Sequence, residues 1–222
     1  MNRRRIVVAV AALALLGGAA VFAFYPRSAP VDSTAVAPES NILERAYSPK
    51  FGPDNAPVTI VEFFDPACEA CRAMHPVVKK ILSDHPDDVR LVLRYTPFHD
   101  GSEEVVRILE AARMQGIYAT VLDAILAAQP QWARHDAPSI EVAIKAAADA
   151  GLNVEEARKF MMMPDITSIL LQDKADVKAA GVRKTPTFFV NGKPLPSFGP
   201  EHLRGTVLRE IEAAGRARKP RS

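Results

Sequence analysis

The feature that most constrains the fold is a strand–helix–strand pattern around the only two cysteines of the chain. Residues 58–64, VTIVEFF, are apolar and rich in β-branched side chains, which predicts a central strand covered on both faces. Residues 89–95, VRLVLRY, alternate in character and predict a second strand. Between them, apolar residues recur at helical spacing, at Met74, Val77, Val78, Ile81 and Leu82. Two strands joined by a helix within about 38 residues predict a parallel pair and an α/β fold.

The rest of the chain predicts a block of helices followed by a short β unit. Apolar stripes at helical spacing occur in four ranges after the second strand: 105–112, 118–126, 140–147 and 166–177. Residues 187–190, TFFV, predict a strand, and the Asn191-Gly192 turn after it predicts a short antiparallel partner. Residues 203–211 carry a last helical stripe. The expected order is therefore β, α, β, a helical block, β, β and α.

The two ends of the chain differ from its middle. Residues 1–25 place three arginines before an apolar run of about 20 residues, which is long enough to span a bilayer. We expect a signal peptide or an uncleaved inner-membrane anchor, and the length of the run favours the anchor. Residues 26–47, rich in Pro, Ala and Ser, predict a flexible linker, and residues 216–222 a basic tail. The domain is expected at 48–215, with a helical insertion at about 100–172.

The charge distribution disfavours a nucleic-acid partner. The chain has 28 basic and 26 acidic residues. Eight of the 28 basic residues lie in the two ends, which leaves 20 against 26 and makes the middle mildly acidic. An exported domain would lie in an oxidising compartment, where a single cysteine pair with no leftover thiol fits one dedicated dithiol. The expected location is the cell envelope, tethered to the inner membrane.

The spacing of Cys68 and Cys71 suits redox chemistry. Cys68 falls where the first helix should begin, and unpaired N–H groups and the helix dipole stabilise a thiolate there. Cys71 lies one turn later on the same face, close enough to form a disulfide. We therefore expect Cys68 to attack and Cys71 to resolve the mixed disulfide. A purely structural bridge is disfavoured, because so short a loop constrains very little chain.

The surroundings of this pair resemble the thioredoxin superfamily, and more closely its exported DsbA-like branch. Glu62, six residues before the first cysteine, matches the buried acid of that family. Pro76 matches the proline that often kinks the active-site helix, and Thr185-Pro186 matches the cis-proline loop that faces the disulfide. The resemblance covers about residues 51–214. It implies a thioredoxin fold with an inserted helical domain.

The resemblance also implies a function. The chain would be a thiol–disulfide oxidoreductase whose only redox group is the dithiol, so no cofactor is expected. Its partners would be exported proteins and a membrane redox protein. Glu62 would accept a proton during exchange, and a cis Pro186 would leave the backbone of Thr185 open to a substrate strand. The direction of exchange (oxidation, isomerisation or reduction) stays open.

The residues between the cysteines depart from those of the strongest oxidants of this family. They are Glu69 and Ala70, and a carboxylate at this place opposes the Cys68 thiolate at the positive end of the helix. Threonine before the cis-proline, here Thr185, is also more typical of reducing or reshuffling members. Both features argue against a strongly oxidising potential.

A metal-handling module is the competing hypothesis. Cys68, Cys71 and His75 can share one helix face and could bind Cu(I) or Zn(II), with His99 as a fourth ligand. The simpler interpretation of His75 is a half-exposed residue that packs beside Pro76, and a third is that it modulates the two thiols. Three further features are interpreted as structural: the consecutive methionines 161–163 as core filling, Trp132 as a packing anchor in a loop, and His99-Asp100 as the start of a helix.

Overall fold

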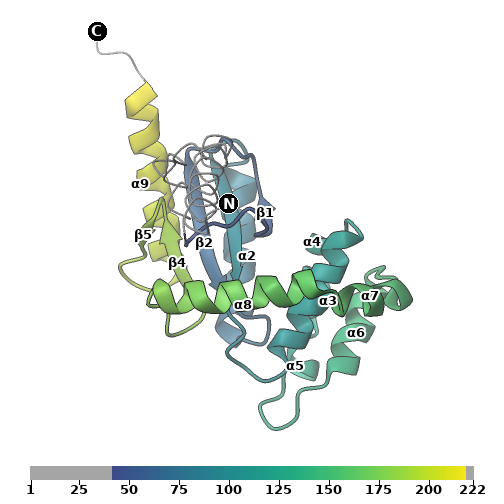
Figure 1. Ribbon diagram of the computed structural model, residues 1–222. Helices are drawn as coiled ribbons and strands as arrows, with labels where there is room; N and C mark the ends of the chain where they lie inside the picture. Colours follow the sequence, from purple (N-terminus) through teal and green to yellow (C-terminus); the bar gives the residue numbers. More distant parts are fainter. Residues whose placement is uncertain (1–41, 219–222) are drawn as a thin grey trace, which may run out of the picture. The chain divides into compact units, whose positions relative to one another are not determined.

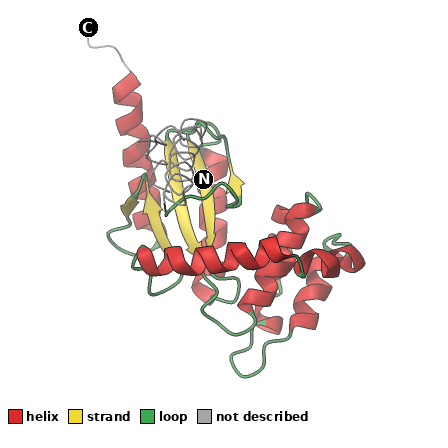
Figure 2. Ribbon diagram, viewed as in Figure 1, coloured by secondary structure: helices red, strands yellow, loops and turns green. Residues whose placement is uncertain are grey.

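A five-stranded sheet forms the centre of residues 42–218, the part of the chain that the computed structural model describes (Figures 1 and 2). In sheet order the strands are β1 (Lys50–Phe51), β3 (Val89–Tyr95), β2 (Val58–Phe64), β4 (Thr187–Val190) and β5 (Lys193–Pro194). β2 runs parallel to β3 and antiparallel to β4, so it occupies the centre. The predicted strands are confirmed. β1 was not predicted, because two residues are too few to show an alternating pattern.

Helices cover both faces of the central strand, as its apolar sequence requires. On one face, Ile60 belongs to an apolar cluster that includes residues of α2 (Glu69–Asp84) and α9 (Pro200–Arg218). On the other face, Phe63 packs in a cluster with Val177 of α8 (Pro164–Ala179). Figure 1 shows α8 crossing one end of the strands. The predicted basic tail begins too early, because α9 continues through Arg216 to Arg218.

The helical insertion lies between β3 and β4. It contains α3 (Ser102–Met114), α4 (Tyr118–Ala127), α5 (Gln129–Trp132), α6 (Ile140–Asp149) and α7 (Val154–Met161). α8 then returns the chain to the sheet, so the expected boundary at residue 172 falls inside a continuous helix. The fold class predicted from the sequence, an α/β thioredoxin fold with an inserted helical domain, is confirmed.

Trp132 was expected in a loop, and the structure places it at the end of the short helix α5. Pro130 stands in the first turn of this helix, where its missing N–H costs nothing. The indole is fully buried and its Nε1–H donates to the carbonyl of Ile125 at 2.9 Å. The interpretation of Trp132 as a packing anchor is therefore confirmed, although the loop around it was wrong.

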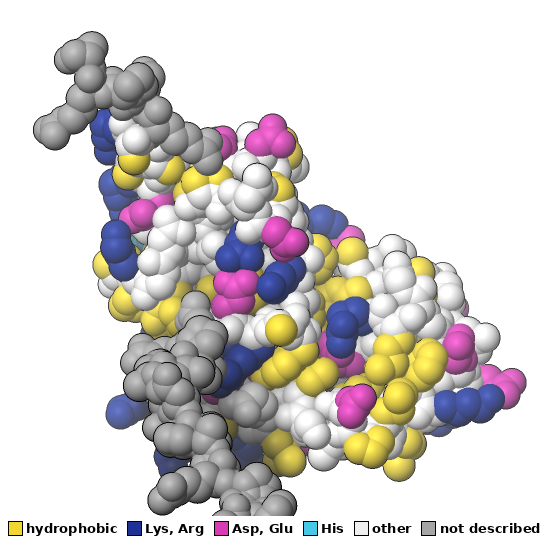
Figure 3. Space-filling view, turned by 45° about the horizontal axis from the view of Figure 1, so that its top comes forward, with side chains coloured by type: hydrophobic (Ala, Val, Ile, Leu, Met, Phe, Trp, Pro, Cys, Tyr) yellow, Lys and Arg dark blue, Asp and Glu magenta, His cyan; other side chains and the backbone are white. Residues whose placement is uncertain are grey.

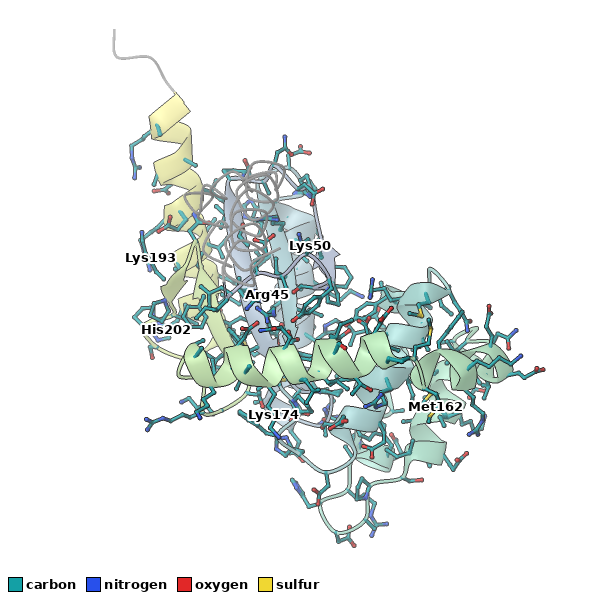
Figure 4. All side chains as sticks on the ribbon, viewed as in Figure 1. Arg45, Lys50, Met162, Lys174, Lys193 and His202 are labelled. Atoms are coloured by element: carbon teal, nitrogen blue, oxygen red, sulfur yellow. The ribbon has the colours of Figure 1, made fainter. Side chains whose placement is uncertain are left out.

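The last part of the predicted linker is packed against the domain. Arg45 makes two hydrogen bonds to Asp176 of α8, at 2.7 and 2.6 Å, and Glu44 accepts two from Arg90 of β3, both at 2.9 Å. Figure 4 shows Arg45 beside α8. We call residues 42–47 the N-terminal strap. The prediction of a flexible linker is wrong for these residues, because a Pro-rich composition does not reveal ion pairs with distant parts of the chain.

The predicted export segment, residues 1–25, and residues 26–41 of the predicted linker lie outside the described residues. Between residues 42 and 218, no helix combines the length and apolar character needed to cross a bilayer. On the face of the molecule shown in Figure 3, acidic and basic side chains are interspersed.

Candidate active site

The two cysteines lie at the start of α2, directly after the central strand. Cys68 is the residue that precedes the helix, with extended backbone angles (φ −72°, ψ 119°), and Cys71 lies in the first turn. Cys71 is fully buried, whereas Cys68 retains 7% of its exposure. Both are free thiols in this structure. The helix continues through Pro76, in agreement with the predicted position of that residue inside it.

The two thiols differ strongly in acidity. The pKa of Cys68 is lowered to about 5, most of all by a hydrogen bond with the Cys71 thiol. Burial opposes this shift, while the Thr185 side chain and the N–H groups of Cys71 and Ala70 add to it. The pKa of Cys71 is raised, chiefly by burial, then by its hydrogen bond to Cys68 and the charge of Glu62. Cys68 is therefore the thiolate and Cys71 the thiol at neutral pH.

The cis-proline loop faces Cys68. The Thr185-Pro186 peptide bond is cis, and the Cys68 Sγ lies 3.2 Å from the carbonyl oxygen of Thr185. A thiol can donate to that carbonyl, but a thiolate cannot. This contact therefore favours the protonated form of Cys68 and is lost on ionisation, when the donors named above dominate. The structure thus brings together Cys68, Cys71, Thr185 and Pro186.

Glu62 lies in the middle of β2, below the cysteine pair. Its side chain is buried, with 3% of the residue exposed, and its Oε1 has no hydrogen-bond partner among the described residues. Burial raises its pKa to about 8, and the negative charge of Cys68 adds to the shift. It also lines a largely apolar cavity of about 370 Å³ together with Phe64, Leu93 and His75. A carboxyl group with this pKa can exchange a proton at neutral pH.

Asp65 organises the loop before Cys68, and sequence reasoning missed it. Its carboxylate is fully buried and accepts five hydrogen bonds. One oxygen binds the N–H of Ala67 at 2.9 Å and the hydroxyl of Ser102. The other binds the N–H groups of Phe98 and His99, at 2.7 and 3.1 Å, and His99 Nδ1 at 2.7 Å. The Asp-Pro pair just before the cysteine motif was the available signal, since aspartate often bonds to nearby N–H groups in turns.

Gln129, which lies in the helical insertion, also binds the loop that contains Cys68. Its Nε2 donates to the carbonyls of Pro66 and Cys68, at 2.7 and 3.0 Å, and the residue is only 1% exposed. It connects α5 to the active-site loop, so the insertion helps to fix the position of Cys68. No local pattern in the sequence indicates this contact, because the two residues are 61 positions apart.

The structure does not assemble the predicted metal ligands. His75 Nε2 pairs with Asp123 Oδ1 of α4 at 2.7 Å, and His99 is bound to Asp65. Within residues 42–218, no three His, Cys, Asp or Glu side chains are grouped so as to hold a metal ion. Within these residues, the structure gives no support to a Cys68–Cys71–His75 site.

The consecutive methionines do not form a common ligand group either. Met161 ends α7, Met162 follows it, and Met163 precedes α8. Met162 is 82% exposed (Figure 4), so core filling describes it poorly. Met161 is partly buried and packs against the main core, as predicted. The break between two helices explains the difference, because it turns successive side chains in different directions.

The chain matches one protein-family model and several curated proteins. The chain matches the model of a family described as thioredoxin over residues 45–207. Among curated proteins, it is 32% identical over 179 residues to a Na+/H+ antiporter NhaA of Herminiimonas arsenicoxydans, and 29% identical over 170 residues to one of Salinispora tropica. The alignments cover 79% and 75% of this chain. The chain spans only about a quarter of those relatives, 27% and 25% of their lengths.

Solved structures give the same fold. A thioredoxin-like oxidoreductase from Silicibacter pomeroyi is 26% identical, with a TM-score of 0.67, and the match covers 81% of this chain and 99% of that one. BdbD from Bacillus subtilis is 22% identical, with a TM-score of 0.66 and coverages of 74% and 93%. Alpha-DsbA1 from Wolbachia pipientis is 15% identical, with a TM-score of 0.71 and coverages of 80% and 97%. The last two support the fold alone.

Proposed function

Because the chain belongs to the thioredoxin family and has a DsbA-like fold, we propose that it is a thiol–disulfide oxidoreductase that exchanges disulfides with exported proteins through Cys68 and Cys71. The observation that carries this proposal is the asymmetry of the pair. Cys68 has a low pKa and lies beside the cis-proline loop, whereas Cys71 is buried and stays protonated. That combination suits one attacking and one resolving thiol.

The exchange proceeds in two steps that balance electrons and protons. When the pair is oxidised, a substrate thiolate attacks Cys68 Sγ, the Cys68–Cys71 bond breaks, and the electron pair leaves on Cys71. Cys71 takes a proton, which Glu62 supplies. A second substrate thiolate then attacks the substrate sulfur of the mixed disulfide, and Cys68 leaves as a stabilised thiolate. The substrate has been oxidised and the pair reduced, and the reverse sequence reduces a substrate disulfide.

We also propose that the protein works in the cell envelope. The apolar run within residues 1–25, with arginines before it, supports export and attachment to the inner membrane. The substrates would then be exported proteins, with a membrane redox protein to restore the pair.

The proposal is tested by disulfide exchange with a model protein and with glutathione. The reduced protein should accelerate reduction of insulin disulfides, and the oxidised protein should oxidise a dithiol peptide. Cys68→Ser should abolish both activities. Cys71→Ser should retain a reactive thiol, detected by alkylation and mass spectrometry, but lose turnover. A wild-type protein that is fully folded and exchanges with neither substrate would overturn the proposal.

A further inference from the structure

We propose that His99 is a second, pH-dependent source of stabilisation for the Cys68 thiolate, and that Asp65 is the positioning residue that holds the imidazolium there. This inference rests on the proposed role of Cys68 as the attacking thiol. It goes beyond that role because it names a regulating charge outside the Cys-x-x-Cys motif. It also explains how the thiolate is supported although Glu69 and Ala70 supply no cation between the cysteines.

The buried carboxylate of Asp65 binds both the cysteine loop and His99. One side of Asp65 holds the N–H of Ala67, the residue before Cys68, at 2.9 Å, and the other side holds the His99 ring at 2.7 Å. The N–H of Asp65 lies 3.5 Å from the sulfur of Cys71. A single fully buried side chain therefore connects the cysteine loop to the loop after β3. His99 has little freedom to move away from the cysteine loop while these bonds persist.

Hydrogen bonding to Asp65 also sets the state of the ring. His99 Nδ1–H donates to the carboxylate, which leaves Nε2 as the nitrogen that gains or loses a proton. Burial lowers the pKa of His99, but the hydrogen bond and charge of Asp65, together with the charges of Cys68 and Asp100, raise it overall. His99 and Cys68 thus interact electrostatically, and each favours the charged form of the other.

Two other basic residues near His99 contact carboxylates other than Asp65. His99 lines a polar cavity of about 220 Å³ with Ala67, Phe98, Asp100, Ala133, Arg134 and His135. Arg134 pairs with Asp136 at 3.0 Å, and His135 lies 3.9 Å from Glu69. Asp100 is the remaining charge on the same loop and opposes the thiolate. His99 is the histidine of this cavity that a buried carboxylate fixes, since Asp65 is fully buried whereas the side chain of His135 is 78% exposed.

The expected size of the effect is modest. The His99 side chain is 40% exposed, and solvent weakens its interaction with Cys68. Hydrogen bonds at the helix start remain the main cause of the low pKa of Cys68. His99 adds a contribution that is present while the ring is protonated and is lost as the pH rises through the pKa of His99. The reduced form is therefore more stabilised than the cysteine motif alone would predict while His99 is protonated, and this extra stabilisation disappears at alkaline pH.

Thiolate absorbance and NMR test the inference in the reduced protein, without any substrate. His99→Gln keeps a donor for Asp65 but removes the charge, and His135→Gln is the matched control in the same cavity. We expect His99→Gln to raise the pKa of Cys68 by about 0.5 to 1 unit and to make the protein about three- to ten-fold less oxidising against glutathione. His135→Gln should change neither quantity by more than about a third of this.

A second measurement uses the wild-type protein, so it does not depend on how well a variant folds. NMR titration should give His99 a higher pKa in the reduced form, which has the thiolate, than in the disulfide form, which does not. Equal His99 pKa values in the two forms, or overlapping Cys68 titrations for wild type and His99→Gln, would overturn the inference. Because both readouts use the protein alone, they do not depend on whether exported proteins are its substrates.

Discussion

Cys68 Sγ lies 3.2 Å from the carbonyl oxygen of Thr185, the residue that precedes the cis Pro186. The attacking sulfur and the backbone that would pair with a substrate strand therefore meet at one point of the surface. Cys71, on the inner side of the same turn, is fully buried. A substrate disulfide can reach Cys68 at this point, and Cys71 reaches the mixed disulfide only from within the protein.

This arrangement predicts which cysteine forms covalent intermediates with substrates. Cys71→Ser should accumulate mixed disulfides with exported proteins, because Cys68, which retains 7% exposure, can attack but nothing resolves the product. Cys68→Ser should accumulate none, since the remaining thiol is buried and protonated. Acid quenching followed by non-reducing gels and mass spectrometry measures this, with the double variant as background. Adducts on Cys71 in the Cys68→Ser protein would reverse the assignment.

Glu62 makes the stability of the reduced protein depend on pH. Its pKa rises from the ordinary 4.5 to about 8 on folding, mainly because of burial. The native state is therefore disfavoured at any pH above 4.5 relative to a chain with an uncharged residue there, and the penalty grows until about pH 8. Glu62→Gln should stabilise the reduced protein at pH 7 by up to about 3 kcal/mol, and by almost nothing at pH 4.

Urea unfolding of both proteins at pH 4, 7 and 8, with reductant present, measures this difference. The same substitution should slow disulfide exchange, because glutamine cannot pass a proton to or from Cys71. A stability difference that stays constant from pH 4 to pH 8 would contradict a raised pKa for Glu62.

The central α/β pattern could be predicted because its signals are local. The strand at residues 58–64, the helix after Cys68 and the strand at 89–95 each show the periodicity of their own structure, and the structure confirms them. The family resemblance then supplied Glu62 and Pro186, which sequence spacing alone could not assign to a site. The structure places both beside the cysteine pair.

The contacts that fix the active-site loop could not be predicted in the same way. Asp65 and His99 are 34 positions apart, and Cys68 and Gln129 are 61 apart. Asp65 and His99 meet because they follow the neighbouring parallel strands β2 and β3, and Gln129 reaches Cys68 because the insertion packs against the cysteine loop. No short motif encodes either contact. The N-terminal strap was missed for a related reason. Its charged residues resemble those of any solvated linker until their partners on β3 and α8 are known.

The strap predicts a cost for truncating the chain too far. A protein that begins at Ala46 lacks Glu44 and Arg45, and so leaves Asp176 and Arg90 without these partners. Asp176 is only 2% exposed, and bonds from Arg45 and Arg94 lower its pKa despite its burial. We expect this protein to be about 1–3 kcal/mol less stable at pH 7 than one that begins at Ser40. Urea unfolding of the two proteins measures the difference.

Full-length Arg45→Met separates the ion pair from the loss of the chain. It keeps the strap but removes the charge, and it should reproduce a large part of the destabilisation. Part of this effect should disappear once the pH is low enough for Asp176 to take up a proton, which lies below the usual range of an aspartate because its pKa is lowered. Equal stability of the Ala46 and Ser40 proteins would show that the strap contributes nothing and that the linker extends, in energetic terms, to residue 47.

Glu69, one of the two residues between the cysteines, leads to a prediction of the redox strength. Attacking cysteines of thioredoxin-fold proteins have pKa values from about 3.5 in strong oxidants to about 7 in reductants. The value of about 5 for Cys68 lies between these limits. Glu69 opposes the thiolate, but its side chain is 74% exposed and lies 3.9 Å from His135, so its effect is screened. Glu69→His should therefore lower the pKa of Cys68 by about one unit or less and make the protein more oxidising.

Thiolate absorbance against pH and equilibration with glutathione measure the two quantities, and Glu69→Gln serves as the matched control. Glutamine removes the negative charge without adding a positive one, so its effect should be about half that of histidine. If neither substitution changes the pKa or the glutathione equilibrium, the hydrogen bonds from Cys71 and the helix start set the potential alone. If Glu69→Gln already gives the full effect, the negative charge of Glu69, and not the absence of a cation, is what keeps this protein from being a stronger oxidant.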